Sequence, residues 1–159
     1  MKNKKEFDIV IIGGGVISLS IALYLSKQKK KIAIIEKEKK IGLGASHFKS
    51  NSSVIHAGIY YKKNSLKSKL CLEGKNLIYE FCEKNKIKTN KCGKIIFAKN
   101  SEDMYKLDKC IERANNNGLK DLYFLKKDDI KKIEPNLNAH AGVFSPSSGV
   151  LDTKSYLNK

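Results

Sequence analysis

The chain of 159 residues contains no tryptophan, two prolines and a single arginine, Arg113. Its 16 acidic residues stand against 32 basic ones, which gives a formal net charge of +16. Proteins that read nucleic acids concentrate Arg and Lys on one surface and add aromatic side chains for stacking. Here the lysines are spread over every segment, so we expect no nucleic-acid partner. Weak peripheral attraction of this charge to an anionic membrane surface stays open.

The four cysteines form no CxxC pair and no cluster with histidine at metal-ligand spacing. Cys71 and Cys82 fall on one predicted helix, too far apart along it to form a disulfide. We therefore expect reduced thiols, no metal site, and a cytoplasmic protein, with peripheral association at the inner face of the membrane as a further option.

A glycine-rich turn follows the first apolar run, DIVIIGGGVIS at residues 8–18, and a second apolar run ends in Glu36. This order predicts a strand, a turn, a helix and a second strand. Gly13 and Gly15 take the first two glycine positions of the dinucleotide-binding fingerprint, and Ser18 takes the third. A signal peptide or a membrane span is disfavoured, because glycines and serines interrupt the run and no cleavage site follows it.

The binding of a dinucleotide explains the residue type at each position of this fingerprint. Gly13 permits a tight turn after the strand, and Gly15 lets the backbone approach a pyrophosphate at the positive end of the following helix. Glu36 can accept hydrogen bonds from ribose hydroxyls, which disfavours a 2′-phosphate and therefore NADP. Ser18 departs from the third glycine, and because serine is small we expect a slightly displaced helix instead of a lost site. NAD and FAD both remain compatible with these residues.

The polar stretch at residues 37–53 is too long for a simple connector, and long loops of this kind are often functional. Its small and hydroxyl-bearing residues suit contacts with phosphate or ribityl oxygens; an unstructured surface loop is the alternative. The candidates are Gly44, Ala45, Ser46, Asn51 and Ser52. The apolar segment at residues 54–61 that follows contains a single histidine, His56, and this pattern alone favours a structural histidine.

Further elements are predicted by periodicity and capping residues. We expect a helix from Ser65 to about Cys82, whose core face carries Leu66, Leu70, Leu77, Ile78 and Phe81. Ser101 is the predicted cap of a second helix that ends at Asn117-Gly118. Strands are expected at residues 93–98, 122–125 and 142–145, a short helix at 128–133, and a helix start at Asp152. The predicted fold class is α/β, with an FAD- or NAD-binding βαβ start and part of an α+β substrate domain, as in the N-terminal part of a larger protein.

The segment NSSVIHAGIYY at residues 51–61 resembles the L-2-hydroxyglutarate oxidase/dehydrogenase family, within the D-amino-acid-oxidase-like FAD-dependent oxidoreductases. The similarity extends over nearly the whole chain, through SLK (65–67), LCLEG (70–74), CGKII (92–96), DI (129–130), EP (134–135) and SPSSGVLD (145–152).

This resemblance implies FAD as the cofactor. Gly13, Gly15 and Glu36 would hold its ADP half, and the loop candidates would run along the pyrophosphate toward the flavin. Residues 1–61 would then form the FAD-binding start, and residues 62–159 would lead into the substrate domain. His56 would lie near the isoalloxazine ring and position the flavin or polarise the substrate hydroxyl, which raises its standing as a catalytic candidate.

The implied reaction is oxidation of a 2-hydroxy acid, L-2-hydroxyglutarate first among the candidates, by hydride transfer to flavin N5. Oxygen or a quinone would then accept the electrons. An amino acid or glycerol 3-phosphate is the alternative substrate within the superfamily. A nucleotide-binding fragment without catalysis is the alternative outside enzymes, and we expect the 159 residues alone to be inactive.

Overall fold

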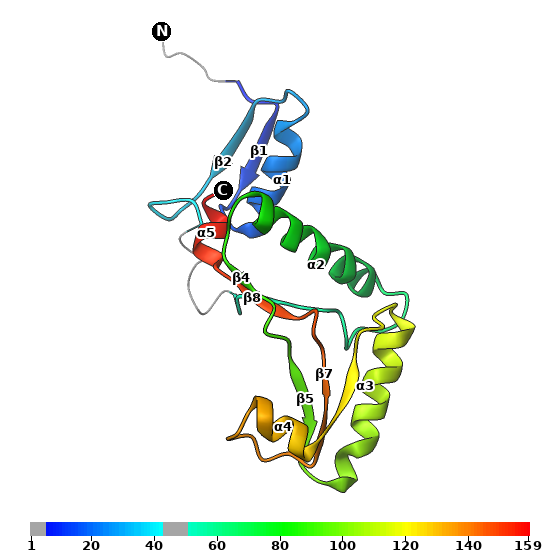
Figure 1. Ribbon diagram of the computed structural model, residues 1–159. Coiled ribbons are helices and arrows are strands. Elements are labelled where there is room, and N and C mark those ends of the chain that lie inside the picture. The colour runs from blue at the N-terminus through cyan, green and yellow to red at the C-terminus, as the bar shows by residue number, and fades with distance from the viewer. Residues whose placement is uncertain (1–5, 43–50) are drawn as a thin grey trace. The chain divides into compact units, whose positions relative to one another are not determined.

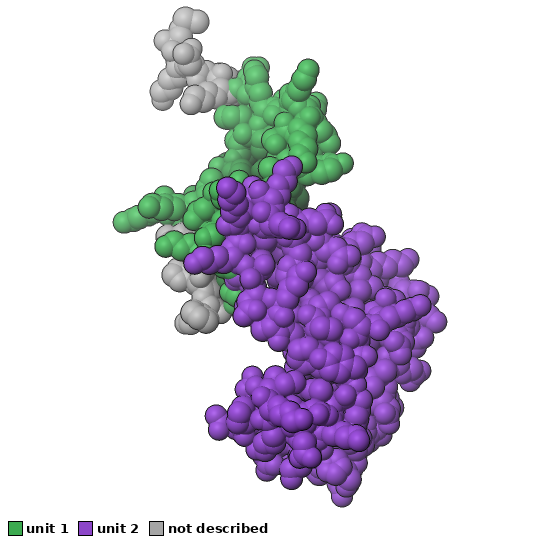
Figure 2. All heavy atoms as spheres, in the orientation of Figure 1, with its two compact units in different colours: residues 1–53, 152–159 green, residues 54–151 purple. Residues whose placement is uncertain are grey.

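The computed structural model describes residues 6–42 and 51–159, which form helices and short strands in the mixed α/β order expected (Figure 1). The backbone contacts divide the chain into two compact units (Figure 2). One unit contains residues 1–53 and 152–159, and the other contains residues 54–151. The functional division expected at residue 61 stays a prediction.

The first unit contains the predicted βαβ motif. Strand β1 (Ile9–Ile12) leads into helix α1 (Val16–Ser26), and strand β2 (Ile32–Ile35) returns beside β1. The two strands pair in parallel, with Ile9 opposite Ile32 and Ile12 opposite Ile35. The last element of the chain, α5 (Thr153–Leu157), belongs to the same unit, and Asp152 caps it by accepting a hydrogen bond from the Ser155 amide at 3.1 Å.

Helix α1 has no fully buried residue. Leu19, Ala22 and Leu25 are half-buried, while Leu23 is 45% exposed. Leu23 therefore does not share the inward face of this helix. That face is centred between Leu19 and Leu25, and the 3.6-residue period leaves Leu23 outside it.

The second unit is built on a three-stranded antiparallel sheet in the order β5 (Ile95–Ala98), β7 (Ala141–Phe144) and β6 (Tyr123–Lys126). Leu107 of helix α3 (Met104–Asn116) packs with Ala98, Ala141 and Val143. Helix α4 (Lys127–Ile133) adds Ile130 to a separate cluster with Leu125 and Ala139. All five elements match predicted ones to within a few residues.

The start of the α3 region differs by one residue from the prediction. A 3-10 turn, η2 (Ser101–Asp103), precedes α3, and its cap is Asn100 instead of Ser101. The Asn100 side chain accepts a hydrogen bond from the Asp103 amide at 3.0 Å. Asparagine and serine are both good caps, so residue type alone does not decide between adjacent positions.

A second antiparallel sheet was not predicted. Its strands are very short, in the order β3 (Val54–Ile55), β8 (Gly149–Leu151) and β4 (Thr89–Asn90). Val150 lies opposite both Val54 and Asn90, so three distant parts of the chain meet at one residue.

Helix α2 (Leu66–Lys84) begins where predicted, because the Ser65 side chain accepts a hydrogen bond from the Ser68 amide at 3.2 Å. Its predicted core face is wrong for Leu66, Leu70 and Leu77, which are 71%, 55% and 62% exposed. Ser68 and Cys82 are the buried residues of this helix instead. The spacing of the leucines identifies a shared face of the helix but not whether another element covers that face.

None of the helices in the described parts of the chain is long and apolar enough to cross a membrane. The four cysteines are free thiols. Within residues 6–42 and 51–159, no cluster of three or more His, Cys, Asp or Glu side chains is arranged to hold a metal ion.

Candidate functional site

The glycine turn connects the carboxyl end of β1 to α1. Gly13 has φ of +94°, a left-handed conformation that side chains other than glycine rarely adopt. Its amide donates a hydrogen bond to the Ile35 carbonyl at 2.7 Å, which ties the turn to the end of β2. The tight turn predicted for Gly13 is present.

Gly15 caps the N-terminus of α1 without a side-chain hydrogen bond. A Cβ atom built on Gly15 would meet no atom of the described part of the chain within 4 Å, apart from its sequence neighbours and the backbone of its own helix, so these residues leave the space beside this helix end open. The first amides of a helix have no partner within the helix, and they carry its positive dipole end. This cradle therefore fits the pyrophosphate of a dinucleotide.

Glu36 is fixed by backbone amides on both of its carboxylate oxygens. Oε1 accepts from the Glu38 amide at 3.0 Å, and Oε2 accepts from the Gly14 amide. These bonds, that of Glu38 first, lower the pKa of Glu36 below its ordinary value of 4.5. The carboxylate is thus ionised and oriented at neutral pH, as acceptance of ribose hydroxyls requires.

Gly14 is a site residue that the fingerprint did not single out. A Cβ at this position would lie 2.8 Å from Glu36 Oε2 and 3.3 Å from Ile41 Cγ2. A side chain at this position would push the Glu36 carboxylate away from the turn. The run of three glycines, where the fingerprint requires two with a free position between them, was the available signal.

Ser18 is half-buried, with its Oγ 3.9 Å from the place that a Cβ on Gly13 would take. A serine is thus accommodated at the third glycine position, facing the turn. The structure brings Gly13, Gly15, Ser18 and Glu36 together around one strand–helix junction.

The flavin-loop candidates are described in part. Gly44, Ala45 and Ser46 lie outside the described residues, and Ser52 is exposed. Asn51 Oδ1 accepts hydrogen bonds from the Ser53 amide at 3.1 Å and from Thr153 Oγ1 at 3.3 Å. Asn51 is therefore held in place from α5 within the first unit.

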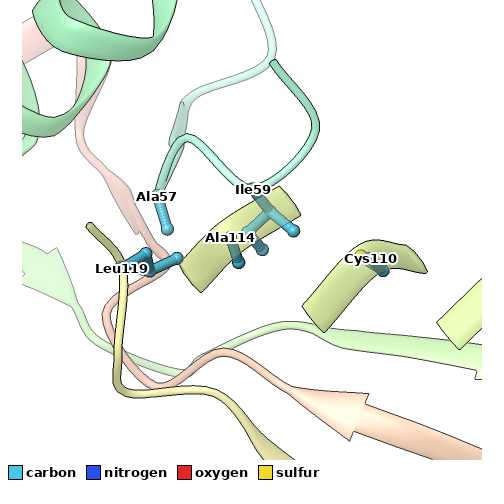
Figure 3. Close-up of a cluster of buried hydrophobic side chains, with 5 residues drawn as sticks. All are labelled: Ala57, Ile59, Cys110, Ala114 and Leu119. Atoms are coloured by element: carbon cyan, nitrogen blue, oxygen red, sulfur yellow. The ribbon is translucent and has the colours of Figure 1, made fainter. Parts of the chain in front are cut away.

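The segment that carries His56 is anchored by its apolar neighbours. Ala57 and Ile59 pack with Cys110 and Ala114 of α3 and with Leu119, which follows the turn at the end of α3 (Figure 3). Ala57, Gly58 and Ile59 are buried, whereas the side chains of His56 and Tyr60 are exposed. The core thus fixes the backbone and presents the histidine and the phenol on the surface of this unit.

Two helices hold the same backbone through hydrogen bonds. Cys71 Sγ of α2 donates to the His56 carbonyl at 3.3 Å, and Asn117 Nδ2 at the end of α3 donates to the Tyr61 carbonyl at 2.8 Å. Gly58 turns the chain between them with φ of +87°.

The imidazole of His56 is in a positive environment. Partial burial lowers its pKa below the ordinary value of 6.5, and the charges of Lys94 and then Lys67 lower the pKa further. His56 is therefore neutral near pH 7 and able to accept a proton. Lys94 was not predicted as a site residue. The CGKII segment contains it, but nothing in the sequence places it beside His56.

A strand–glycine–helix turn with an acid at the end of the second strand defines a dinucleotide-binding βαβ unit. Residues 8–159 match the family model described as FAD dependent oxidoreductase, so the chain belongs to this family. The expected resemblance, fold class and cofactor, FAD, are confirmed.

The similar proteins include L-2-hydroxyglutarate dehydrogenases named as mitochondrial. That of Caenorhabditis elegans is 41% identical over 149 residues, covering 92% of this chain and 34% of the relative. The human enzyme is 40% identical over 149 residues, covering 92% of this chain and 32% of the relative. The chain therefore spans about a third of the length of these relatives.

Solved structures confirm the fold. The dithionite-reduced L-α-glycerophosphate oxidase of Mycoplasma pneumoniae with FAD bound superposes with a TM-score of 0.87 at 30% identity, over 98% of this chain and 41% of that one. The glycine oxidase of Geobacillus kaustophilus has a TM-score of 0.81 at 24% identity, over 96% and 42% of the two chains.

The expected cytoplasmic location is contradicted, because the relatives named above are mitochondrial enzymes. Cysteine usage does not separate one reducing compartment from another. The inference from cysteine usage was therefore too narrow.

Proposed function

We propose that the protein carrying this chain oxidises a 2-hydroxy acid, with L-2-hydroxyglutarate as the first candidate. FAD, when bound, supplies the acceptor for the substrate hydrogen at its N5 atom and passes the electrons on to oxygen or a quinone. The support is family membership together with relatives named L-2-hydroxyglutarate dehydrogenase at about 40% identity.

In this proposal the first unit binds the cofactor. Gly13 and Gly15 shape the turn for the pyrophosphate, and Glu36 accepts from the ribose hydroxyls. Ser18 keeps α1 close to the turn. Gly44, Ala45, Ser46, Asn51 and Ser52 are proposed to continue this binding toward the flavin.

His56 is proposed as the catalytic base that takes the hydroxyl proton of the substrate. The single observation that carries this role is its presentation: buried neighbours fix its backbone while the neutral imidazole is exposed. A general base near its working pH contributes about 10²–10⁴-fold to the rate. In this proposal the Cα hydrogen of the acid would pass to the flavin, and the hydroxyl proton would pass to His56.

The test is turnover of L-2-hydroxyglutarate by the FAD-loaded protein with a dye as electron acceptor. His56→Gln is expected to lower kcat/KM by about 100-fold or more while FAD stays bound. The matched control is His140→Gln, because His140 is also an exposed histidine of the second unit. Equal activity of the two variants would contradict the role of His56.

Glycerol 3-phosphate is the second candidate substrate. The observation in its favour is the TM-score of 0.87 with the M. pneumoniae L-α-glycerophosphate oxidase. Turnover of glycerol 3-phosphate without turnover of L-2-hydroxyglutarate in the same assay would replace the first proposal with this one.

A further inference from the structure

Two lysines flank the His56 segment, each stacked on one of its tyrosine rings. Lys94 Nζ lies 5.1 Å from the centroid of the Tyr60 ring, and Lys67 Nζ lies 4.8 Å from that of the Tyr61 ring. They come from different elements, since Lys94 precedes β5 and Lys67 is in the first turn of α2. Both charges act on the imidazole of His56.

Within residues 6–42 and 51–159, no acid forms an ion pair with either lysine. Over the residues that the structure describes, the side-chain ion pairs are Lys106–Asp103 and Lys132–Asp129, and neither involves Lys94 or Lys67. The tyrosines and cysteines beside them carry no negative charge at pH 7, because burial raises the pKa of Tyr60, Tyr61, Cys71 and Cys110. Lys75 and Arg113 add further positive charge near Cys71 and Cys110. The surface around His56 therefore keeps an uncompensated positive charge.

Lys94 is the better fixed of the two. It is half-buried, and its backbone exchanges hydrogen bonds with Ser145, which is fully buried: Lys94 N donates at 3.1 Å and its carbonyl accepts at 2.9 Å. Among the residues that the structure describes, the ammonium group of Lys94 has no carboxylate partner. Lys67 is exposed on its helix and is free to move toward a bound anion.

We propose that Lys94, assisted by Lys67, forms a cationic seat beside His56 that binds a carboxylate of the acid substrate. The seat gives the oxidation its preference for acids, and it rests on the proposed function. A carboxylate there gains charge-assisted hydrogen bonds and supplies the counter-charge that the lysines lack. The Tyr60 ring limits where the ammonium group of Lys94 can move.

The test uses Lys94→Met in the FAD-loaded protein, since Met keeps much of the aliphatic stem that packs on Tyr60. The KM for L-2-hydroxyglutarate is expected to rise by about tenfold or more, with a smaller change in kcat. Lys94→Arg keeps the charge and is expected to restore most of the affinity. The matched control is Lys91→Met, because Lys91 Nζ also stacks on a tyrosine, 4.5 Å from the Tyr79 ring centroid, without being among the charges that act on His56.

A second measurement does not depend on turnover. Glutarate, which cannot be oxidised at a hydroxyl, is titrated into the protein labelled with ¹⁵N-histidine, and the His56 imidazole signals are followed. Glutarate is expected to shift these signals in the wild type and in Lys91→Met but not in Lys94→Met. Inorganic phosphate serves as the comparison anion.

The outcomes separate the two proposals. A wild-type KM and wild-type glutarate shifts in Lys94→Met overturn the seat, as do equal effects of Lys94→Met and Lys91→Met. A Lys94-dependent response to phosphate but none to glutarate overturns the choice of a carboxylate. Lys94-dependent glutarate binding in a protein that oxidises no 2-hydroxy acid supports the seat and removes the proposed function.

Discussion

At the residue scale, the adjacent glycines Gly14 and Gly15 lack a side chain for different reasons. A Cβ on Gly14 would displace the Glu36 carboxylate, because it would lie 2.8 Å from Oε2, whereas a Cβ on Gly15 would meet no atom of the described residues within 4 Å. The requirement at Gly14 is thus internal to the fold. At Gly15 the described residues set no such requirement, and the proposed binding of a pyrophosphate at the helix end would supply one.

Gly15→Ala is therefore expected to separate folding from cofactor binding. Its φ of −79° suits alanine, so the free energy of unfolding should fall by about 1 kcal/mol or less, the difference between these residues as caps. FAD affinity should fall by about tenfold or more, because the methyl group occupies the pyrophosphate position. Flavin fluorescence titration and denaturant unfolding measure the two quantities. Gly74→Ala in α2, also in open space, is the control and should leave FAD affinity unchanged.

The pH dependence of kcat/KM tests the environment of His56. Its pKa in the folded protein is lowered from 6.5, so the neutral, proton-accepting form persists to lower pH than in a free histidine. Activity should rise with pH along an acid limb whose midpoint lies below 6.5. Lys94→Met removes one cause of the lowering and should move this limb to higher pH. An acid limb unmoved by Lys94→Met would contradict the placement of that charge.

At the element scale, the predictions from sequence were good where the signal is local. The βαβ start, the Ser65 cap of α2 and the Asn117 end of α3 follow from turn chemistry and periodicity, and all three are present. The sheet of β3, β8 and β4 could not be predicted, because two- and three-residue strands carry no periodicity and their pairing joins distant segments.

The same limit explains why Lys94 was not predicted as a site residue. Lys94 is brought to Tyr60 by the packing of β5 against the His56 segment, a contact that no local pattern encodes.

The prediction that the leucines of α2 belong to the core rests on their spacing alone. Spacing identifies a shared face of a helix but not which face is covered.

Helices α2 and α3 provide a matched pair for stability. Leu107 in α3 is 2% exposed and lies in the cluster against β5 and β7, whereas Leu77 in α2 is 62% exposed. Leu107→Ala should lower the free energy of unfolding of this chain by about 2–5 kcal/mol through the cavity that it leaves. Leu77→Ala should change it by about 0.5 kcal/mol or less. Urea unfolding of the two variants makes the comparison, and equal losses would contradict the burial of α3.

At the scale of the whole molecule, the first unit exposes several large apolar side chains. Ile12, Ile17 and Tyr24 are 84%, 74% and 67% exposed, and the sheet there has only two parallel strands. Parallel sheets are normally covered on both faces. The chain spans about a third of the length of its L-2-hydroxyglutarate dehydrogenase relatives, so the activity proposed here belongs to the protein that carries it.

The central claim is that this protein uses bound FAD to oxidise a 2-hydroxy acid. The most direct measurement is the flavin absorbance of the FAD-loaded protein, without oxygen, after addition of L-2-hydroxyglutarate. The account predicts that the absorbance bleaches in wild type, far more slowly in His56→Gln, and recovers when an acceptor is added. A flavin that stays oxidised with L-2-hydroxyglutarate but bleaches with glycerol 3-phosphate or an amino acid would contradict it.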